Sequence, residues 1–102
     1  MNTIKIAGKV VKKEKQKKND SFLNILVAVP LHLKVYDEGN FKQLYNYVSL
    51  SLFGLDNDQY TNLRKGNFVE IIGQIVGNSN EDGTEKRDLI VIPKSIMKGG
   101  TK

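Results

Sequence analysis

A strict two-residue alternation in residues 45–53, Tyr-Asn-Tyr-Val-Ser-Leu-Ser-Leu-Phe, is the feature that most restricts the fold of this chain. Successive side chains of a β-strand point to opposite faces, so the Val and Leu side chains share one face and predict a core. The opposite face has an aromatic ring near each end, Tyr47 and Phe53, with Ser49 and Ser51 between them. Rings on an uncluttered strand face are typical platforms for stacking nucleic-acid bases.

The length and composition predict one small domain. The chain has 102 residues, contains no Cys, and has no apolar run long enough to span a membrane. Residues 1–5 lack the apolar segment of a secretory leader. Without Cys there is neither a disulfide framework nor a thiolate metal site, and we expect a cytoplasmic protein with no membrane partner.

Periodicity and turn residues predict five strands and one helix. Asp56 is placed to cap the helix and Gly66 to follow it, while Tyr60 and Leu63 share the helix face expected to pack under the sheet. Residues 31–44 form a connector that contains the turn signal Asp-Glu-Gly-Asn, and its two arms can pair as a protruding hairpin. The expected strands are residues 4–11, 22–29, 45–53, 67–76 and 87–92, and the expected helix is residues 57–65.

This order, with the helix between the third and fourth strands, is that of an all-β five-stranded Greek-key OB-fold barrel. Gly8 inside the first strand predicts a bulge or sharp bend, and residues 12–21 predict a loop. Pro93 is expected to stop the last strand or to mark a sheet edge. We expect one domain over residues 1–97, followed by a short basic tail over residues 98–102.

The positive charge is concentrated near the start of the chain. Residues 5–18 contain seven Lys and one Glu, a net charge of +6, whereas the remaining residues carry nine basic and ten acidic side chains, a net charge of −1. Such a cluster is an electrostatic footprint for a polyanion. The alternative interpretation is a solubilising loop. Lysine contacts to phosphates predict sequence-tolerant, salt-sensitive binding.

The pattern resembles the family of bacterial single-stranded DNA-binding proteins, which have an OB fold. The resemblance runs from Ile4 to about Ile96, and its most specific part is the pair Phe53-Gly54 followed by a helix and Leu-Arg-Lys-Gly. The segments that carry it are residues 6–10, 24–29, 48–54 and 63–75.

The resemblance implies that bases stack on Tyr47 and Phe53, the two positions that the strand spacing also selects. Three departures are the absence of Trp, the presence of Asn80 where many members place a stacking aromatic, and a basic rather than acidic end. We therefore expect weaker binding and no recruitment of replication proteins through an acidic tail. A short, tail-less accessory member, or a primosomal protein of the PriB type, fits the length.

The expected nucleic-acid contacts combine lysines, aromatics and the two serines. Tyr47 and Phe53 are alternatively covered by a partner subunit or by the connector. Tyr36, Phe41 and Tyr45 either extend the stacking path or form a local cluster that holds the hairpin together. The expected contact residues are Lys9, Lys12, Lys13, Lys15, Lys17, Lys18, Lys34, Tyr36, Phe41, Tyr45, Tyr47, Ser49, Ser51, Phe53, Lys86 and Arg87.

No catalytic constellation is evident in the sequence, and we predict that the protein is not an enzyme and needs no cofactor or metal. His32 is the single histidine, whereas a metal site needs three or four clustered ligands. Phe68 and Ile72 are expected on the outer face of the fourth strand, which predicts a homo-oligomeric interface, dimeric or tetrameric.

The leading hypothesis is a non-enzymatic single-stranded DNA-binding protein in replication, recombination or repair. The alternatives are an OB-fold protein-interaction module of the primosome type that binds DNA weakly, or an RNA-binding OB domain.

Overall fold

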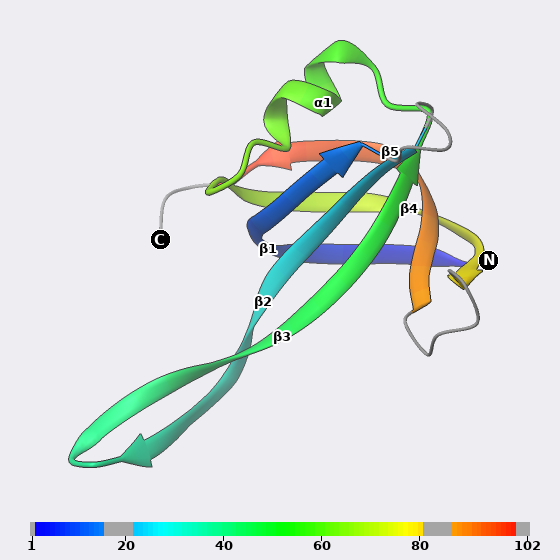
Figure 1. Ribbon diagram of the computed structural model, residues 1–102. Helices are drawn as coiled ribbons and strands as arrows, with labels where there is room; N and C mark the ends of the chain where they lie inside the picture. Colours follow the sequence, from blue (N-terminus) through cyan, green and yellow to red (C-terminus); the bar gives the residue numbers. More distant parts are fainter. Residues whose placement is uncertain (1, 16–21, 81–86, 100–102) are drawn as a thin grey trace.

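The computed structural model describes residues 2–15, 22–80 and 87–99, which form a single closed barrel with one long hairpin projecting from it (Figure 1). The order of elements is as predicted. The elements are β1 (Thr3–Lys15), β2 (Phe22–Asp37), β3 (Asn40–Phe53), α1 (Asn57–Asn62), β4 (Phe68–Asn80) and β5 (Arg87–Lys98).

The strands close in the order β1-β2-β3-β5-β4, and β4 pairs back onto β1. Every neighbouring pair is antiparallel except β3 and β5, which run parallel. This topology confirms the predicted five-stranded OB barrel. The described part of the chain contains no helix long and apolar enough to cross a membrane.

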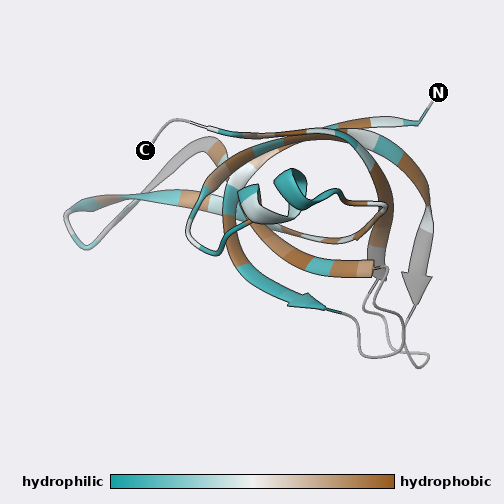
Figure 2. Ribbon diagram, turned by 90° about the horizontal axis from the view of Figure 1, so that it is seen from above, coloured by the Kyte–Doolittle hydropathy of each residue, from teal (hydrophilic) through white to brown (hydrophobic). Residues whose placement is uncertain are grey.

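The core lies inside the barrel and is built from the inward-facing residues of all five strands. Leu50 and Leu52 of β3 are fully buried, as the alternation of that segment predicts, and Val48 packs against them. Figure 2 shows the apolar residues of the barrel strands around a closed ring, with α1 over one end. The remaining buried core residues are Ile6, Val10, Leu23, Ile25, Val27, Leu63, Val69, Ile71, Val91 and Ile96.

β1 closes the barrel because it pairs with two strands in turn. Its first half pairs with β4 and its second half with β2, and Lys9 has register partners in both. At the changeover, a Cβ on Gly8 would lie 2.4 Å from the carbonyl oxygen of Ala28, so only glycine permits this approach. β1 bends along its length (Figure 1), and its bulge lies between Val10 and Lys12, just after Gly8.

β1, β4 and β5 all run past their predicted ends, and β4 reaches Asn80 instead of residue 76. β1 continues to Lys15 through residues expected to form a loop, because the first residues of β2 pair with it. β5 continues past Pro93 to Lys98, and Gly99 donates a hydrogen bond to the Phe68 carbonyl, so these two residues belong to the barrel rather than to a tail.

The prediction that Pro93 stops β5 was wrong: Pro93 keeps a register partner in β4, next to a register shift at which proline is tolerated in a sheet. Its partner across the sheet is Gly73, where a Cβ would lie 3.0 Å from the Pro93 Cα and closer still to Ile92.

The helix α1 is shorter than predicted. Asp56 caps it as expected: its carboxylate accepts a hydrogen bond from the Gln59 amide, and the Gln59 side chain accepts from the Asp56 amide. The helix ends at Asn62, so Gly66 does not follow it directly. Gly66 instead forms a turn with a φ of 96° and donates a hydrogen bond to the Val10 carbonyl, which ties this segment to β1.

The predicted protruding hairpin is confirmed. We call residues 31–44 the hairpin arm; it continues the β2–β3 ladder beyond the barrel and ends in the pair Asp37 and Asn40. Glu38 and Gly39 both have positive φ, as a two-residue hairpin turn of type I′ requires. The ladder is irregular where the arm leaves the barrel, between Pro30 and Lys34, and there the Gln43 side chain donates to the Leu31 carbonyl.

Candidate nucleic-acid interface

A row of exposed aromatic side chains follows the outer face of β3. We call Phe41, Tyr45, Tyr47 and Phe53 the aromatic stripe; their odd-numbered spacing places them on one face of the strand. Tyr47 is 60% exposed and Phe53 is 40% exposed, so neither is covered within the described part of the chain. The alternative that the hairpin arm covers them is therefore wrong for this single chain, because the arm projects away from the barrel.

A cross-strand aromatic pair stands at each end of the stripe. Phe22 is the register partner of Phe53, and their ring centroids lie 5.1 Å apart at a tilt of 42°. Tyr36 is the partner of Phe41 near the tip of the hairpin arm, with centroids 5.5 Å apart and the rings edge to face. The Tyr36 and Phe41 rings contact each other, and both remain exposed. A local cluster that holds the hairpin together is therefore compatible with a stacking path along the same residues.

The two serines between Tyr47 and Phe53 differ in accessibility. Ser49 is partly buried, but Ser51 is only 1% exposed, and its hydroxyl donates a 2.7 Å hydrogen bond to the Asn24 side chain. The expectation that Ser51 is open to a base was therefore wrong. Its outer face is closed because the register places it between Asn24 of β2 and Ile90 of β5.

Tyr60 of α1 belongs to this surface, although the sequence predicted that it packs under the barrel. Leu63 is fully buried as predicted, but Tyr60 is exposed and contacts the end of β1. The Lys13 ammonium lies 3.7 Å from the centroid of its ring and donates a 2.8 Å hydrogen bond to its carbonyl oxygen. The Lys15 ammonium lies 5.5 Å from the same centroid.

Nothing in the sequence indicated this contact. It depends on the unexpected continuation of β1 through Lys15, which carries two of the predicted phosphate-binding lysines to the helix. Phe22 was likewise not selected, although it is the first residue of β2 and pairs with Phe53 at the end of β3.

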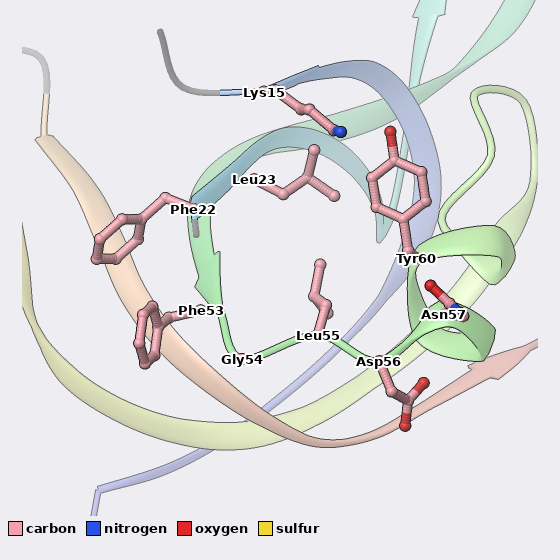
Figure 3. Close-up of a pocket in the computed structure, with 9 residues that line it drawn as sticks. All are labelled: Lys15, Phe22, Leu23, Phe53, Gly54, Leu55, Asp56, Asn57 and Tyr60. Carbon is pink, nitrogen blue, oxygen red and sulfur yellow. The ribbon is translucent and has the colours of Figure 1, made fainter. Parts of the chain in front are cut away.

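A hollow of about 440 Å³ opens at the end of the barrel beside α1. Figure 3 shows Leu23, Leu55, Lys15 and Tyr60 around it, with the rings of Phe22 and Phe53 side by side on the outer side of the β2–β3 ribbon. We call this the barrel-end hollow. The described residues that line it are Lys15, Phe22, Leu23, Phe53, Gly54, Leu55, Asp56, Asn57 and Tyr60.

The other predicted basic residues are only partly placed by the structure. Lys9 and Lys12 are exposed on β1, and Lys12 makes a weak surface ion pair with Glu14, with 3.8 Å between the charged atoms. Lys17, Lys18 and Lys86 lie outside the described residues. Lys34 and Arg87 lie on described strands, but their side chains are not described.

The predicted interface residues are less exposed than expected. Phe68 and Ile72 lie on the opposite face of β4 from the buried Val69 and Ile71, as predicted, but both are partly buried within the chain. Phe68 packs beside Gly99, which explains its cover. The large apolar residues that are exposed on β4 and β5 are Val76, Ile92 and Met97.

Within the described ranges, no three His, Cys, Asp or Glu side chains converge as a metal site would require. Asp56 engages the first turn of α1 through its carboxylate, which is the capping role expected for it. His32 lies on β2, but its side chain is not among those that the structure describes.

The barrel defines the chain as an OB-fold protein, and solved structures share this fold. No family profile matches the sequence, and no curated protein does either. A small single-stranded DNA-binding protein from Streptomyces coelicolor superposes with a TM-score of 0.58 at 14% identity, over 95% of this chain and 93% of that one.

Two further structures agree with this result. The protein PriB from Ralstonia solanacearum gives a TM-score of 0.60 at 10% identity, covering 98% of this chain and 99% of its own. The mitochondrial single-stranded DNA-binding protein Rim1 from S. cerevisiae gives 0.56 at 18% identity, covering 96% of each chain. At these identities the likeness shows a common fold, as the resemblance in the sequence predicted.

Proposed function

We propose that this protein binds single-stranded DNA without catalysing a reaction, and that it serves replication, recombination or repair. The observation that carries the proposal is the aromatic stripe: four exposed rings on one face of one strand, with lysines of β1 at one end. Exposed rings stack on bases of any sequence, and lysines attract phosphates without reading bases.

The fold supports the same proposal. Three structures with this barrel are a small single-stranded DNA-binding protein, PriB and a mitochondrial single-stranded DNA-binding protein. OB barrels also serve other functions, so the stripe carries more weight than the fold.

In the proposed mode, phosphates are drawn toward the end of β1 and bases stack along β3. Tyr47 and Phe53 are the central contacts, and Tyr45, Phe41 and Tyr36 extend the path along the hairpin arm. Lys13 and Lys15 join the path at Tyr60. Lys17, Lys18, Lys34, Lys86 and Arg87 remain proposed phosphate contacts.

Exposed Val76, Ile92 and Met97 support self-association as a second property. We propose a homo-oligomer that uses this part of β4 and β5 with Phe68 and Ile72 at its margin. Sedimentation of the wild-type chain beside Met97→Glu tests this, and an unchanged monomeric mass for both would contradict it.

The test of DNA binding is fluorescence anisotropy with a labelled oligo(dT) of about 30 nucleotides, beside the matching duplex and an oligo(U) of the same length. We expect a preference for single-stranded DNA, and a log–log salt slope of roughly −0.7 per phosphate neutralised. Equal binding of oligo(U) would favour the RNA alternative. Absence of binding even at low salt would favour the protein-interaction alternative.

Tyr47→Ala then tests the stacking mechanism. We expect it to weaken binding by about 1–3 kcal/mol while the fold persists, because one platform is lost. Tyr47→Phe keeps the ring and should bind almost normally, and Leu44→Ala removes an exposed apolar side chain on the opposite face of β3 from the stripe. Equal affinity of Tyr47→Ala and wild type would contradict base stacking at this position.

A further inference from the structure

The barrel-end hollow has the composition of a ligand site. Its volume of about 440 Å³ falls in the range of roughly 300–1,000 Å³ that is typical of small-molecule pockets. Leu23 and Leu55 supply aliphatic surface, Tyr60 supplies an aromatic wall, and Lys15 supplies a positive charge. Asp56 also lines the hollow, but its carboxylate points away from it and caps α1. Apolar walls with a few polar groups favour a flat, partly apolar ligand that carries negative charge.

The helix α1 lies beside the hollow without filling it. None of its six residues is buried, and the core beneath it is completed by Leu63 just after the helix. Figure 2 shows α1 lying over the ring of strands at this end.

The aromatic wall of the hollow is held in place before any ligand arrives. Lys13 contacts Tyr60 twice, through the ring at 3.7 Å and through the carbonyl oxygen at 2.8 Å. Lys13 does not line the hollow, so it holds the tyrosine from outside. The Tyr60 amide also donates to the Asp56 carbonyl at 2.9 Å, inside the capped first turn. The two hydrogen bonds fix the main chain of Tyr60 and the cation–π contact orients its ring, and preorganisation of this kind favours binding.

The hollow is continuous with the proposed path of the strand. Phe53 is the last residue of the aromatic stripe, and it also borders the hollow. Figure 3 shows the Phe22 and Phe53 rings on the outer side of the β2–β3 ribbon, whereas Leu23, Leu55 and Tyr60 lie on the side of the hollow. A strand that follows the stripe beyond Phe53 reaches the hollow by passing round the end of the β2–β3 ribbon at Gly54, with Lys15 at the rim of the hollow.

We propose that the barrel-end hollow takes one nucleobase turned out of the bound strand, with the attached phosphate on Lys15. This inference rests on the proposed single-strand binding and adds a discrete subsite to it. The base lies against Tyr60 and the two leucines, and the exposed carboxamide of Asn57 offers both a donor and an acceptor to its edge. A duplex keeps its bases stacked and paired and so offers none to this subsite.

Thymidine monophosphate is the probe that tests the subsite directly in the wild-type protein. In carbon–proton NMR spectra, we expect it to shift the methyl signals of Leu23 and Leu55 and the ring signals of Tyr60. The ring signals of Tyr36, which contacts Phe41 at the far end of the stripe, should stay in place. Inorganic phosphate is the control and should leave the methyl signals unmoved. Shifts confined to the stripe, or none in the hollow, would overturn the proposal.

Filling the hollow with a larger side chain tests how much the hollow contributes to the affinity for single-stranded DNA. We expect Leu55→Trp to weaken oligo(dT) binding by about five- to 150-fold, as for the loss of one stacked base, with the stripe intact. Tyr60→Leu removes the aromatic wall by a milder change and should act in the same direction, and it decides the question if the tryptophan variant does not fold. Wild-type affinity in folded Leu55→Trp or Tyr60→Leu would overturn the subsite.

The two proposals fail in different ways. If the wild-type protein does not bind oligo(dT), the proposed function itself is wrong. The wild-type protein can instead bind oligo(dT) in a way that depends on Tyr47. If thymidine monophosphate then shifts no NMR signal of the hollow, and Leu55→Trp and Tyr60→Leu bind oligo(dT) normally, only the subsite is wrong.

Discussion

The barrel portion of β3 and the hairpin arm belong to one continuous ladder with β2, yet they obey different physical constraints. In the barrel, β3 has β5 as a second neighbour and its inner face is closed over the core. In the arm it has only β2, and the aromatic residues Tyr36 and Phe41 stand 65% and 71% exposed. Side chains alternate between the two faces along the whole of β3. One face is buried in the barrel, whereas in the arm both faces of the ribbon are accessible.

The two aromatic pairs make this difference concrete. Phe22 and Phe53 contact each other at the end of the barrel beside α1, and both are among the residues that line the barrel-end hollow. Tyr36 and Phe41 contact each other over a similar distance but have no barrel behind them. A two-stranded ribbon is only marginally stable by itself, so we expect the second pair to adapt to a ligand and the first to be preformed.

The largest expected effect comes from matched leucine substitutions in β3. Leu50 is fully buried in the core, whereas Leu44 lies in the hairpin arm and is exposed. We expect Leu50→Ala to lower the free energy of unfolding by about 2–5 kcal/mol because it leaves a cavity. Leu44→Ala should lower it by less than about 1 kcal/mol. Urea unfolding followed by circular dichroism measures both, and equal losses would show that the arm folds as part of the core.

Truncating the pair at the tip of the arm should separate binding from stability. We expect Phe41→Ala to weaken oligo(dT) binding by about 1–3 kcal/mol if the ring stacks on a base. The free energy of unfolding should change by less than about 0.5 kcal/mol, since the ring is mostly exposed. Anisotropy and urea unfolding on the same preparation decide between this outcome and a purely local cluster, for which affinity would not change.

Matched glycine substitutions distinguish the two regions by backbone. Gly8 has no room for a Cβ in the barrel, where Ala28 approaches closely, whereas Gly39 at the arm tip has space but a φ of 85°. We expect Gly8→Ala to destabilise the whole barrel by about 1–3 kcal/mol through overpacking. Gly39→Ala should instead speed amide exchange in the arm and leave barrel amides protected. Faster exchange throughout the barrel in Gly39→Ala would contradict this separation.

The smallest effect concerns the serine that the barrel covers. Ser51→Ala removes the hydroxyl that donates to Asn24, and we expect it to lower the free energy of unfolding by about 0.5–1.5 kcal/mol. Its oligo(dT) affinity should equal that of the wild type because the hydroxyl is inaccessible. Ser49→Ala serves as the matched control on the same face. A loss of affinity without a loss of stability in Ser51→Ala would return this residue to the binding surface.

Local periodicity predicted much of the molecule. The alternation of residues 45–53 correctly separated the core face of β3 from the face that carries Tyr47 and Phe53. The turn signal at residues 37–40 correctly predicted the hairpin, and Asp56 correctly predicted the helix cap. These features depend on residues close together in the chain, where strand period, turn geometry and capping act directly.

The errors lie where distant segments meet. The extension of β1 to Lys15 depends on pairing with β2, and the passage of β5 through Pro93 depends on the room left by Gly73. The burial of Ser51 depends on its neighbours in two other strands. None of these partners is near in sequence, so no local sequence pattern predicts these contacts.

The sequence by itself determined the type and order of the elements, the core faces of β3 and β4 and the presence of an aromatic row on β3. Only the tertiary structure decided which of those outward residues are accessible, that Tyr60 stands with Lys13 and Lys15, and that a hollow opens beside Phe53. The physical reason is that side-chain direction follows from the local backbone, whereas accessibility depends on what other strands place beside it when the barrel closes.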